Sequence, residues 1–328
     1  MALEAPPPEV DLRPLTTSDL IDRGFSLYRQ NFAGLLLLAL LSQAAPLLAQ
    51  VVTSTLRLMP PMEDMVGASL HAIGSALFFL AIMILALIVS FLFGVAMTFY
   101  VAEAYLGKTP SLALSFRRLG RCLIGSTWTC LLKYLLYALS LIFLALAAVA
   151  VRVWFLLSPP ESFGGFIVFA LGTAGLFIAS LVPILVVFMR LMVTAPVLAL
   201  EDATGWAACR RSSALVRYDP GLGFFYWGET RLSLLLLPLF IIQLLASTLT
   251  SVPLILSQIN DAVRHGTSAQ FANQSDIVVV GSQILTYVAG SLILPLYIIA
   301  VTLFYYDVRI RREGFDLEFL ASRLEKTA

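Results

Sequence analysis

Three basic residues of this sequence lie inside long apolar stretches or directly at the end of one: Lys133, Arg190 and Arg231. An ionised side chain is costly to bury in lipid, so residues of this kind commonly mark a functional site. We therefore take the three as candidate contacts for an anionic headgroup or substrate. For Lys133 and Arg231 the simpler interpretation is that each side chain extends to the inner headgroups and has no further role. Glu229, two residues before Arg231, is available to neutralise it.

Acidic residues near the ends of these stretches are candidates for structural ion pairs. Three of them could pair with Arg190 and so tie helix ends together: Glu103, Glu201 and Asp307. Asp307 also has a local candidate partner, Arg311, at the four-residue spacing that brings two side chains together on a helix.

Amide side chains lie deeper in the apolar stretches, among them Gln43, Gln243 and Gln283. In lipid an amide needs a partner on another helix, because no water is there to bind it. Interhelical hydrogen bonds in a packed bundle are the preferred interpretation. The alternative is a cavity at which prolines such as Pro46 and Pro295 interrupt the helices, as in transporters.

Hydrolysis of a phosphodiester would need clustered carboxylates with a metal ion and histidine acid–base groups. The sequence has two histidines, His71 and His265, in separate connections and without metal-ligand spacing. Carboxylates in the same connections could complete a site, although solvated loop charge is the simpler interpretation: Glu63, Asp64, Asp261 and Asp276. We therefore predict no catalytic residue, no metal and no cofactor, and expect that the protein is not an enzyme.

The elements that carry these residues are predicted to be membrane-spanning helices. Apolar residues make up 59% of the chain and charged residues 12%, against roughly 45–50% and 25% in soluble proteins. About 20 apolar residues are needed to cross a bilayer. Six stretches reach that length: 33–56, 66–101, 122–151, 163–188, 222–256 and 277–306. The expected fold class is an all-α integral membrane protein with six transmembrane helices.

Lysine and arginine are distributed unequally between the connections. Fifteen lie in the N-terminal segment, the second and fourth connections and the C-terminal tail, whereas the alternate connections hold only Arg57, Arg152 and Arg264. Because short cytoplasmic loops carry the excess of positive charge, both termini are predicted to be cytoplasmic.

A unit of about 93 residues is predicted to recur three times, over residues 16–108, 109–201 and 202–314. Each copy consists of a short amphipathic helix at the membrane interface, followed by a pair of spans. The first interfacial helix follows a capping-box-like start from Thr16 to Asp19. The second is expected to follow Thr109, with Pro110 at its first position.

The third interfacial helix is expected to open after Asp202 or Thr204. Its apolar stripe of Trp206, Cys209 and Val216 is weaker than those of the other two. Residues 1–15 are expected to form a disordered cytoplasmic tail, and residues 315–328 a cytoplasmic helix.

Three segments of the chain carry a family resemblance. They are LRPLTTSDLIDRGFSLYRQNF (12–32), Glu201 with RRS (210–212) and LVR (215–217), and FYYDVRIRREGFDLE (304–318). Together they resemble the bacterial family named for the membrane domain of glycerophosphoryl diester phosphodiesterase, over nearly the whole chain. Ser213 and Ala214 depart from its pattern, in which a bulky aromatic residue is expected.

The resemblance implies a module of the bacterial inner membrane. It does not carry over phosphodiesterase activity, because only about twenty residues follow the last predicted span.

We expect a non-catalytic scaffold or accessory component for envelope or lipid-related proteins. The alternatives are a transporter or lipid-handling protein with a central cavity and, least favoured, a membrane phosphodiesterase. Expected partners are membrane lipids of the anionic inner leaflet, together with a membrane or cytoplasmic protein. The net charge of +1 gives no reason to expect nucleic acid, and the sequence indicates no oligomeric state.

Overall fold

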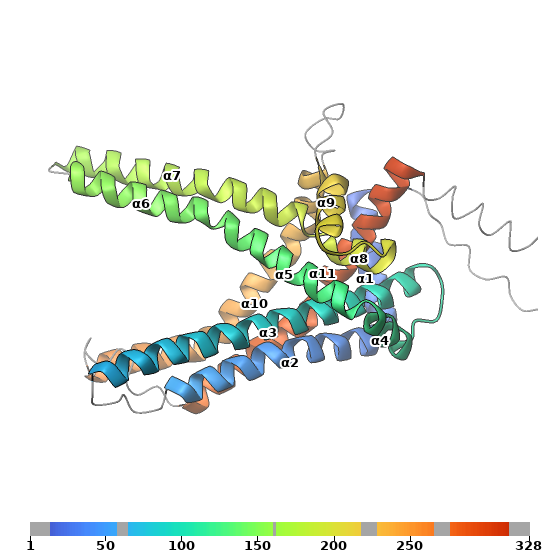
Figure 1. The fold of residues 1–328 in the computed structure, drawn as a ribbon, viewed down its shortest axis with the longest axis horizontal. Helices are drawn as coiled ribbons and strands as arrows, with labels where there is room; N and C mark the ends of the chain where they lie inside the picture. Colours follow the sequence, from blue (N-terminus) through green and yellow to red (C-terminus); the bar gives the residue numbers. More distant parts are fainter. Residues whose placement is uncertain (1–13, 58–64, 160–161, 218–227, 266–275, 315–328) are drawn as a thin grey trace, which may run out of the picture. The chain divides into compact units, whose positions relative to one another are not determined.

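A computed structural model describes residues 14–57, 65–159, 162–217, 228–265 and 276–314. These residues form eleven helices and no strand (Figure 1). Six helical segments of the described part are long and apolar enough to cross a membrane: Phe32–Val52, Ile73–Tyr105, Leu123–Leu157, Phe163–Glu201, Gly228–Ser257 and Val278–Glu313. The prediction of six such helices is confirmed. The chain divides into two compact units, residues 1–123 with 234–328 and residues 124–233.

The first unit is built around three long helices that pack side by side, α2, α3 and α11 (Figure 1). Its helices are α1 (Thr17–Gln30), α2 (Phe32–Arg57), α3 (Met65–Tyr105), α4 (Leu112–Arg121), most of α10 (Gly228–His265) and α11 (Asp276–Glu313). The short helix α1 lies against α11, and α4 lies against α3. The core of the unit is apolar and fully buried, with Leu38, Val95, Met97, Leu303 and Phe304 at its centre.

The second unit contains one long helical hairpin and two short helices. It comprises nearly all of α5 (Leu123–Ser140), α6 (Ile142–Leu157), α7 (Phe163–Arg190), α8 (Thr194–Glu201), α9 (Gly205–Val216) and the first residues of α10. Helices α6 and α7 pack side by side (Figure 1). A break at Leu141 separates α5 from α6. The Leu141 N–H donates to the carbonyls of both Tyr137 and Ala138.

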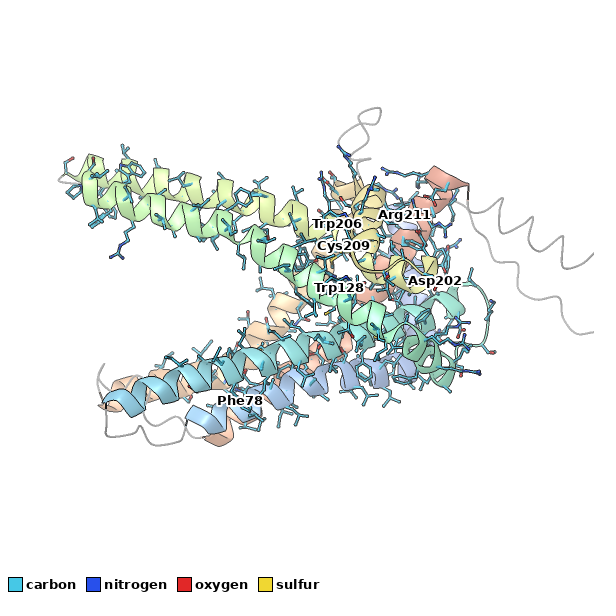
Figure 2. The ribbon with its side chains drawn as sticks, in the orientation of Figure 1. Phe78, Trp128, Asp202, Trp206, Cys209 and Arg211 are labelled. Atoms are coloured by element: carbon cyan, nitrogen blue, oxygen red, sulfur yellow. The ribbon has the colours of Figure 1, made fainter. Side chains whose placement is uncertain are left out.

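Large apolar side chains remain exposed on the long helices of both units. Phe78 on α3 is 48% exposed (Figure 2), Leu146 on α6 60% and Leu245 on α10 64%. A soluble protein rarely exposes so much contiguous apolar surface. The chain is accordingly a multi-pass membrane protein whose outward-facing side chains have lipid as their solvent.

The starts of the short helices agree in part with the sequence. Helix α1 has the predicted capping box, since the Thr16 hydroxyl accepts from the Asp19 N–H and the Asp19 carboxylate accepts from the Thr16 N–H. Helix α4 corrects the expected start at Thr109: its N-cap is Ser111, whose N–H points to a carboxylate oxygen of Glu103 at 3.4 Å. That contact holds Ser111 in an extended conformation, so the helix begins later.

Helix α9 begins after Thr204, one of the two expected positions. Its buried face differs from the predicted stripe. Cys209 and Val216 are buried, but Trp206 is 61% exposed. The small residues Gly205 and Ala208 occupy the interior in its place, because α9 lies too close to the neighbouring helices to bury an indole. The helix expected over residues 315–328 lies outside the described residues.

Gly34 allows α2 and α3 to approach closely, because a Cβ at this position would collide with the Tyr100 hydroxyl. We expect Gly34→Ala to lower the free energy of unfolding by about 1–3 kcal/mol through overpacking. The measurement is thermal unfolding in detergent. Gly94→Ala is the matched control, since its Cβ would meet only Ile298 at 3.8 Å. Equal stability of the two variants would contradict this packing.

Candidate functional site

In the first unit two buried carboxylates each hold an arginine. Asp307, 1% exposed, accepts from the Arg311 Nε at 3.0 Å and from the Leu15 N–H at 2.8 Å. Arg311 in turn donates to the Leu15 carbonyl at 2.6 Å, so the pair ties Leu15, two residues before α1, to the end of α11. The predicted pairing of Asp307 with Arg311 is confirmed. Glu103, 5% exposed at the end of α3, pairs with Arg118 of α4 at 3.0 Å.

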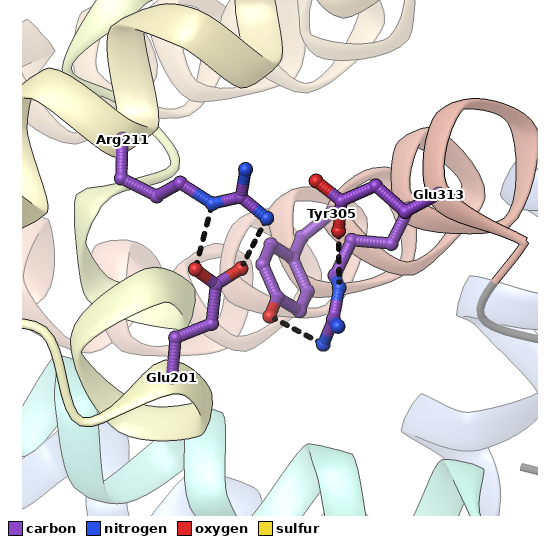
Figure 3. Close-up of polar contacts among 5 residues, drawn as sticks. Glu201, Arg211, Tyr305 and Glu313 are labelled. Carbon is purple, nitrogen blue, oxygen red and sulfur yellow. Dashed lines mark hydrogen bonds and ion pairs between the residues drawn. The ribbon is translucent and has the colours of Figure 1, made fainter. Parts of the chain in front are cut away.

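A third pair of the first unit lies one turn from Asp307. Arg309 binds Glu313 at 3.0 Å and donates to the Tyr305 hydroxyl at 3.2 Å (Figure 3). The side chain of Glu313 is 30% exposed and that of Asp307 is 0% exposed, so the carboxylate of this pair is the more open to solvent.

The second unit has two carboxylate–arginine pairs of its own. Glu201, the last residue of α8, receives two hydrogen bonds from Arg211 of α9, at 2.7 and 3.3 Å (Figure 3). Arg190, the last residue of α7, donates its Nε to Glu229 at 2.7 Å. This corrects the expected partner of Arg190. Glu229 stands in the first turn of α10, and a Cβ on the preceding Gly228 would touch the Val216 carbonyl at 2.6 Å, so α10 starts against the end of α9.

Lys133 and Arg231, the other two candidate anion contacts, are half-buried in the second unit. The Lys133 ammonium lies 5.7 Å from the centre of the Tyr137 ring. Burial raises the pKa of the Cys209 thiol, and the Lys133 charge lowers it by less. That Lys133 and Arg231 contact lipid headgroups remains a prediction.

Two of the three candidate interhelical amides converge in the first unit. The amide nitrogens of Gln43 on α2 and Gln243 on α10 lie 3.9 and 4.0 Å from the position that a Cβ of Gly290 would take on α11. Gln283 lies two turns earlier on α11, and its side-chain oxygen is buried without a hydrogen-bond partner among the described residues. Packing of Gln43 and Gln243 against Gly290 explains the positions of these two amides without a cavity.

The carboxylates and histidines of the predicted outer connections are not placed. The side chains of His71, His265, Glu63 and Asp261 lie outside the described residues. Within the described ranges, no group of three or more His, Cys, Asp or Glu side chains could hold a metal ion.

An open cleft of about 700 Å³ in the second unit brings arginines and apolar side chains together. Helices α5 and α6 contribute an apolar wall that includes Leu136, Leu139 and Phe143. The opposite wall holds Arg190 from α7 and, from α9, Arg210 and Arg217. The described lining contains no carboxylate. A volume of this size lies within the range of about 300–1,000 Å³ that is usual for small-ligand sites.

The position of α9 beside α5 depends on a close backbone approach. The Gly205 N–H donates to the Thr129 hydroxyl at 2.7 Å, and a Cβ on Gly205 would lie 2.8 Å from the Trp128 ring. The φ angle of Gly205 is +61°, which also favours glycine. Further along α9, the Ser212 hydroxyl donates to the Arg190 carbonyl at 2.7 Å. These bonds hold α9 against the first half of α5 and the end of α7.

Cys209 lines the cleft together with Trp206 and Arg210. Figure 2 labels Cys209 and Trp206 on α9. Burial raises the pKa of the Cys209 thiol, and the nearby Lys133 ammonium lowers it by a smaller amount. At neutral pH the thiol is therefore protonated, which makes it a weak nucleophile and a poor metal ligand. The chemistry available in the cleft is the binding of an anion with an apolar portion.

The sequence alone identified Arg190 but not the cleft. Arg210 and Arg217 were recognised only as part of the general positive charge. The signal that could have located the cleft is the pair Ser213–Ala214, because both small residues line it and leave space where an aromatic side chain would fill it.

Comparisons with known protein families, with curated proteins and with solved structures found no match.

The buried Asp307 pair should matter more for stability than the exposed Glu313 pair. Asp307→Asn removes a charge-assisted hydrogen bond, for which we expect a loss of about 1.5–3 kcal/mol. Glu313→Gln, on the same helix, should change stability by less than about 1 kcal/mol. Thermal unfolding of both variants in the same detergent measures the difference. A larger effect at Glu313 would mean that Asp307 is not the anchor of α11.

Proposed function

We propose that the protein is a non-catalytic module of the bacterial inner membrane that associates with anionic phospholipids and serves lipid-related or envelope proteins as an accessory component. The observation that carries the proposal is the combination, on α4 and on α9, of exposed arginines with exposed aromatic side chains. The exposed Arg117 and Arg121 follow Phe116, which is 38% exposed. Arg210 follows Trp206, which is 61% exposed. Helices with such faces bind at the headgroup level of a negatively charged leaflet.

The proposed topology has both termini in the cytoplasm and three copies of an interfacial helix followed by two spans. Two ion pairs at equivalent positions in the chain support the proposed repeat. Glu103 at the end of α3 binds Arg118 in the next helix, and Glu201 at the end of α8 binds Arg211 in the next helix. The same chemistry thus recurs where one proposed copy passes into the next.

The second candidate is a lipid-handling protein that takes a lipid into a cavity. The cleft of about 700 Å³ in the second unit favours it, since arginine and apolar side chains share its lining. Gln243 and Gln283, expected to line a central cavity, belong to the first unit instead. The two candidates differ in whether lipid is held at one discrete site or only at the surface.

The topology can be tested by thiol labelling in intact cells, on a background in which Cys122, Cys130 and Cys209 are replaced by alanine. We expect Ser162→Cys, between α6 and α7, to react with a membrane-impermeant maleimide from outside. Thr109→Cys, between α3 and α4, should react only after the membrane is opened. The reverse pattern would overturn the proposed orientation.

Association with anionic lipid can be tested by reconstitution. In nanodiscs that contain equal parts of phosphatidylglycerol and phosphatidylcholine, the lipid retained on extraction should be enriched in phosphatidylglycerol. The enrichment should decrease as salt rises, because each exposed arginine contributes roughly 1 kcal/mol of screened attraction. The Arg117→Gln/Arg121→Gln variant should show less enrichment. No preference at low salt would contradict the proposal.

A further inference from the structure

We infer that the cleft between α5, α6, α7 and α9 is a discrete site for one phosphate-bearing glycerolipid. Its phosphate is held by Arg190 and Arg210, and an acyl chain lies along the leucine wall. This inference rests on the proposed association with anionic lipid and deepens it, because it names one site and one ligand class.

The arginines of the cleft have unused hydrogen-bonding capacity. Among the described residues, Arg190 binds only Glu229, and it does so through Nε, which leaves its two terminal nitrogens without a partner. Arg210 is exposed and has no carboxylate partner in the described part of the chain. Two guanidinium groups that face one space offer the planar donor sets that bind phosphate oxygens in pairs.

The charge of the cleft matches a phosphate and not a zwitterionic headgroup. Its described lining includes three arginines and no carboxylate, and Glu229 balances one of the three through its bond to Arg190. Arg210, which has no carboxylate partner among the described residues, therefore keeps its positive charge for a ligand. A phosphatidylcholine headgroup would bring its own cation into this space, where no acidic side chain of the described lining would receive it.

The opposite wall suits an acyl chain. Leu136, Leu139 and Phe143 lie on consecutive turns of α5 and α6, across the break at Leu141. Leu139 and Phe143 are each about half exposed, at 49% and 50%. A ligand with an anionic head and a hydrocarbon tail would contact both walls, whereas inorganic phosphate would contact only the arginines.

Small residues keep the cleft open. Ser213 and Ala214 stand between the two arginines of α9 that line it, Arg210 and Arg217. A bulky side chain at Ala214 would occupy the ligand space without changing any charge. Ala207, two turns earlier on the same side of α9, is exposed but does not line the cleft, so it provides a matched position for control.

The experiment is native mass spectrometry of the full chain in detergent, titrated with dipalmitoyl phosphatidylglycerol. We expect a saturable complex with one bound lipid. Arg210→Gln should raise its Kd about tenfold, and Ala214→Phe should abolish it. Arg152→Gln, which removes an equal charge from an exposed position of α6 outside the cleft, and Ala207→Phe should leave the Kd within twofold of the parent. Circular dichroism and thermal unfolding of each variant establish that it is folded.

Two further ligands identify the source of the phosphate. Dipalmitoyl phosphatidylcholine should bind at least tenfold more weakly than phosphatidylglycerol, and glycerol phosphate should not displace the lipid at equal concentration. Displacement by glycerol phosphate would show that the site binds a soluble phosphate ester and not a lipid. Equal binding of phosphatidylcholine, or an unchanged Kd in Ala214→Phe, would overturn the site itself.

The titration in detergent does not depend on orientation in the membrane. Inverted thiol labelling would therefore refute the proposed topology without affecting the cleft. Conversely, if phosphatidylglycerol is enriched in nanodiscs but no single saturable complex forms, surface association stands and the discrete site fails. Equal weakening of lipid binding by Arg152→Gln and Arg210→Gln would have the same meaning.

Discussion

Carboxylates buried at helix ends must each be satisfied by a guanidinium, and much of the local structure follows from this requirement. A carboxylate left unpaired in a weakly polar environment is strongly destabilising. Asp307, at 1% exposure, therefore holds both Arg311 and the backbone before α1. Glu103 holds Arg118 and also contacts the residue at which α4 begins. In the second unit, Glu201 fixes Arg211 and Glu229 fixes Arg190. The ion pairs thus determine where the short helices start and how they lie.

The long helices obey a different constraint, because lipid provides no hydrophobic force between them. Close approach through small residues takes its place, as at Gly34 against Tyr100 in the first unit and at Gly172 against Trp154 in the second. Prolines within helices leave carbonyls to be satisfied from neighbours. Pro46 frees the Ser42 carbonyl on α2, and the Ser90 hydroxyl of α3 donates to it at 3.1 Å.

The cleft of the second unit lies where ion-paired short helices meet long helices that approach one another through small residues. The break at Leu141 separates α5 from α6, and α9 is held across the ends of α5 and α7 by Gly205 and Ser212. Small residues on α9 leave the space between unfilled. Arginines that would be surface charge on an isolated helix consequently face leucines. An arrangement of this kind can bind an amphiphile, and its position depends on the same hydrogen bonds that fix α9.

The composition and the apolar run lengths by themselves determined the six membrane-length helices and the absence of strands found in the described part of the chain, because crossing lipid demands long uninterrupted apolar segments. Local spacing likewise determined the Thr16–Asp19 capping box and the Asp307–Arg311 pair. The tertiary structure alone decided that Arg190 binds Glu229, that α4 starts at Leu112 and that Trp206 faces outward. These features depend on contacts between residues far apart in the chain. Arg190, one of the three basic candidates of the sequence, lines a cleft only because α9 packs against the end of α7.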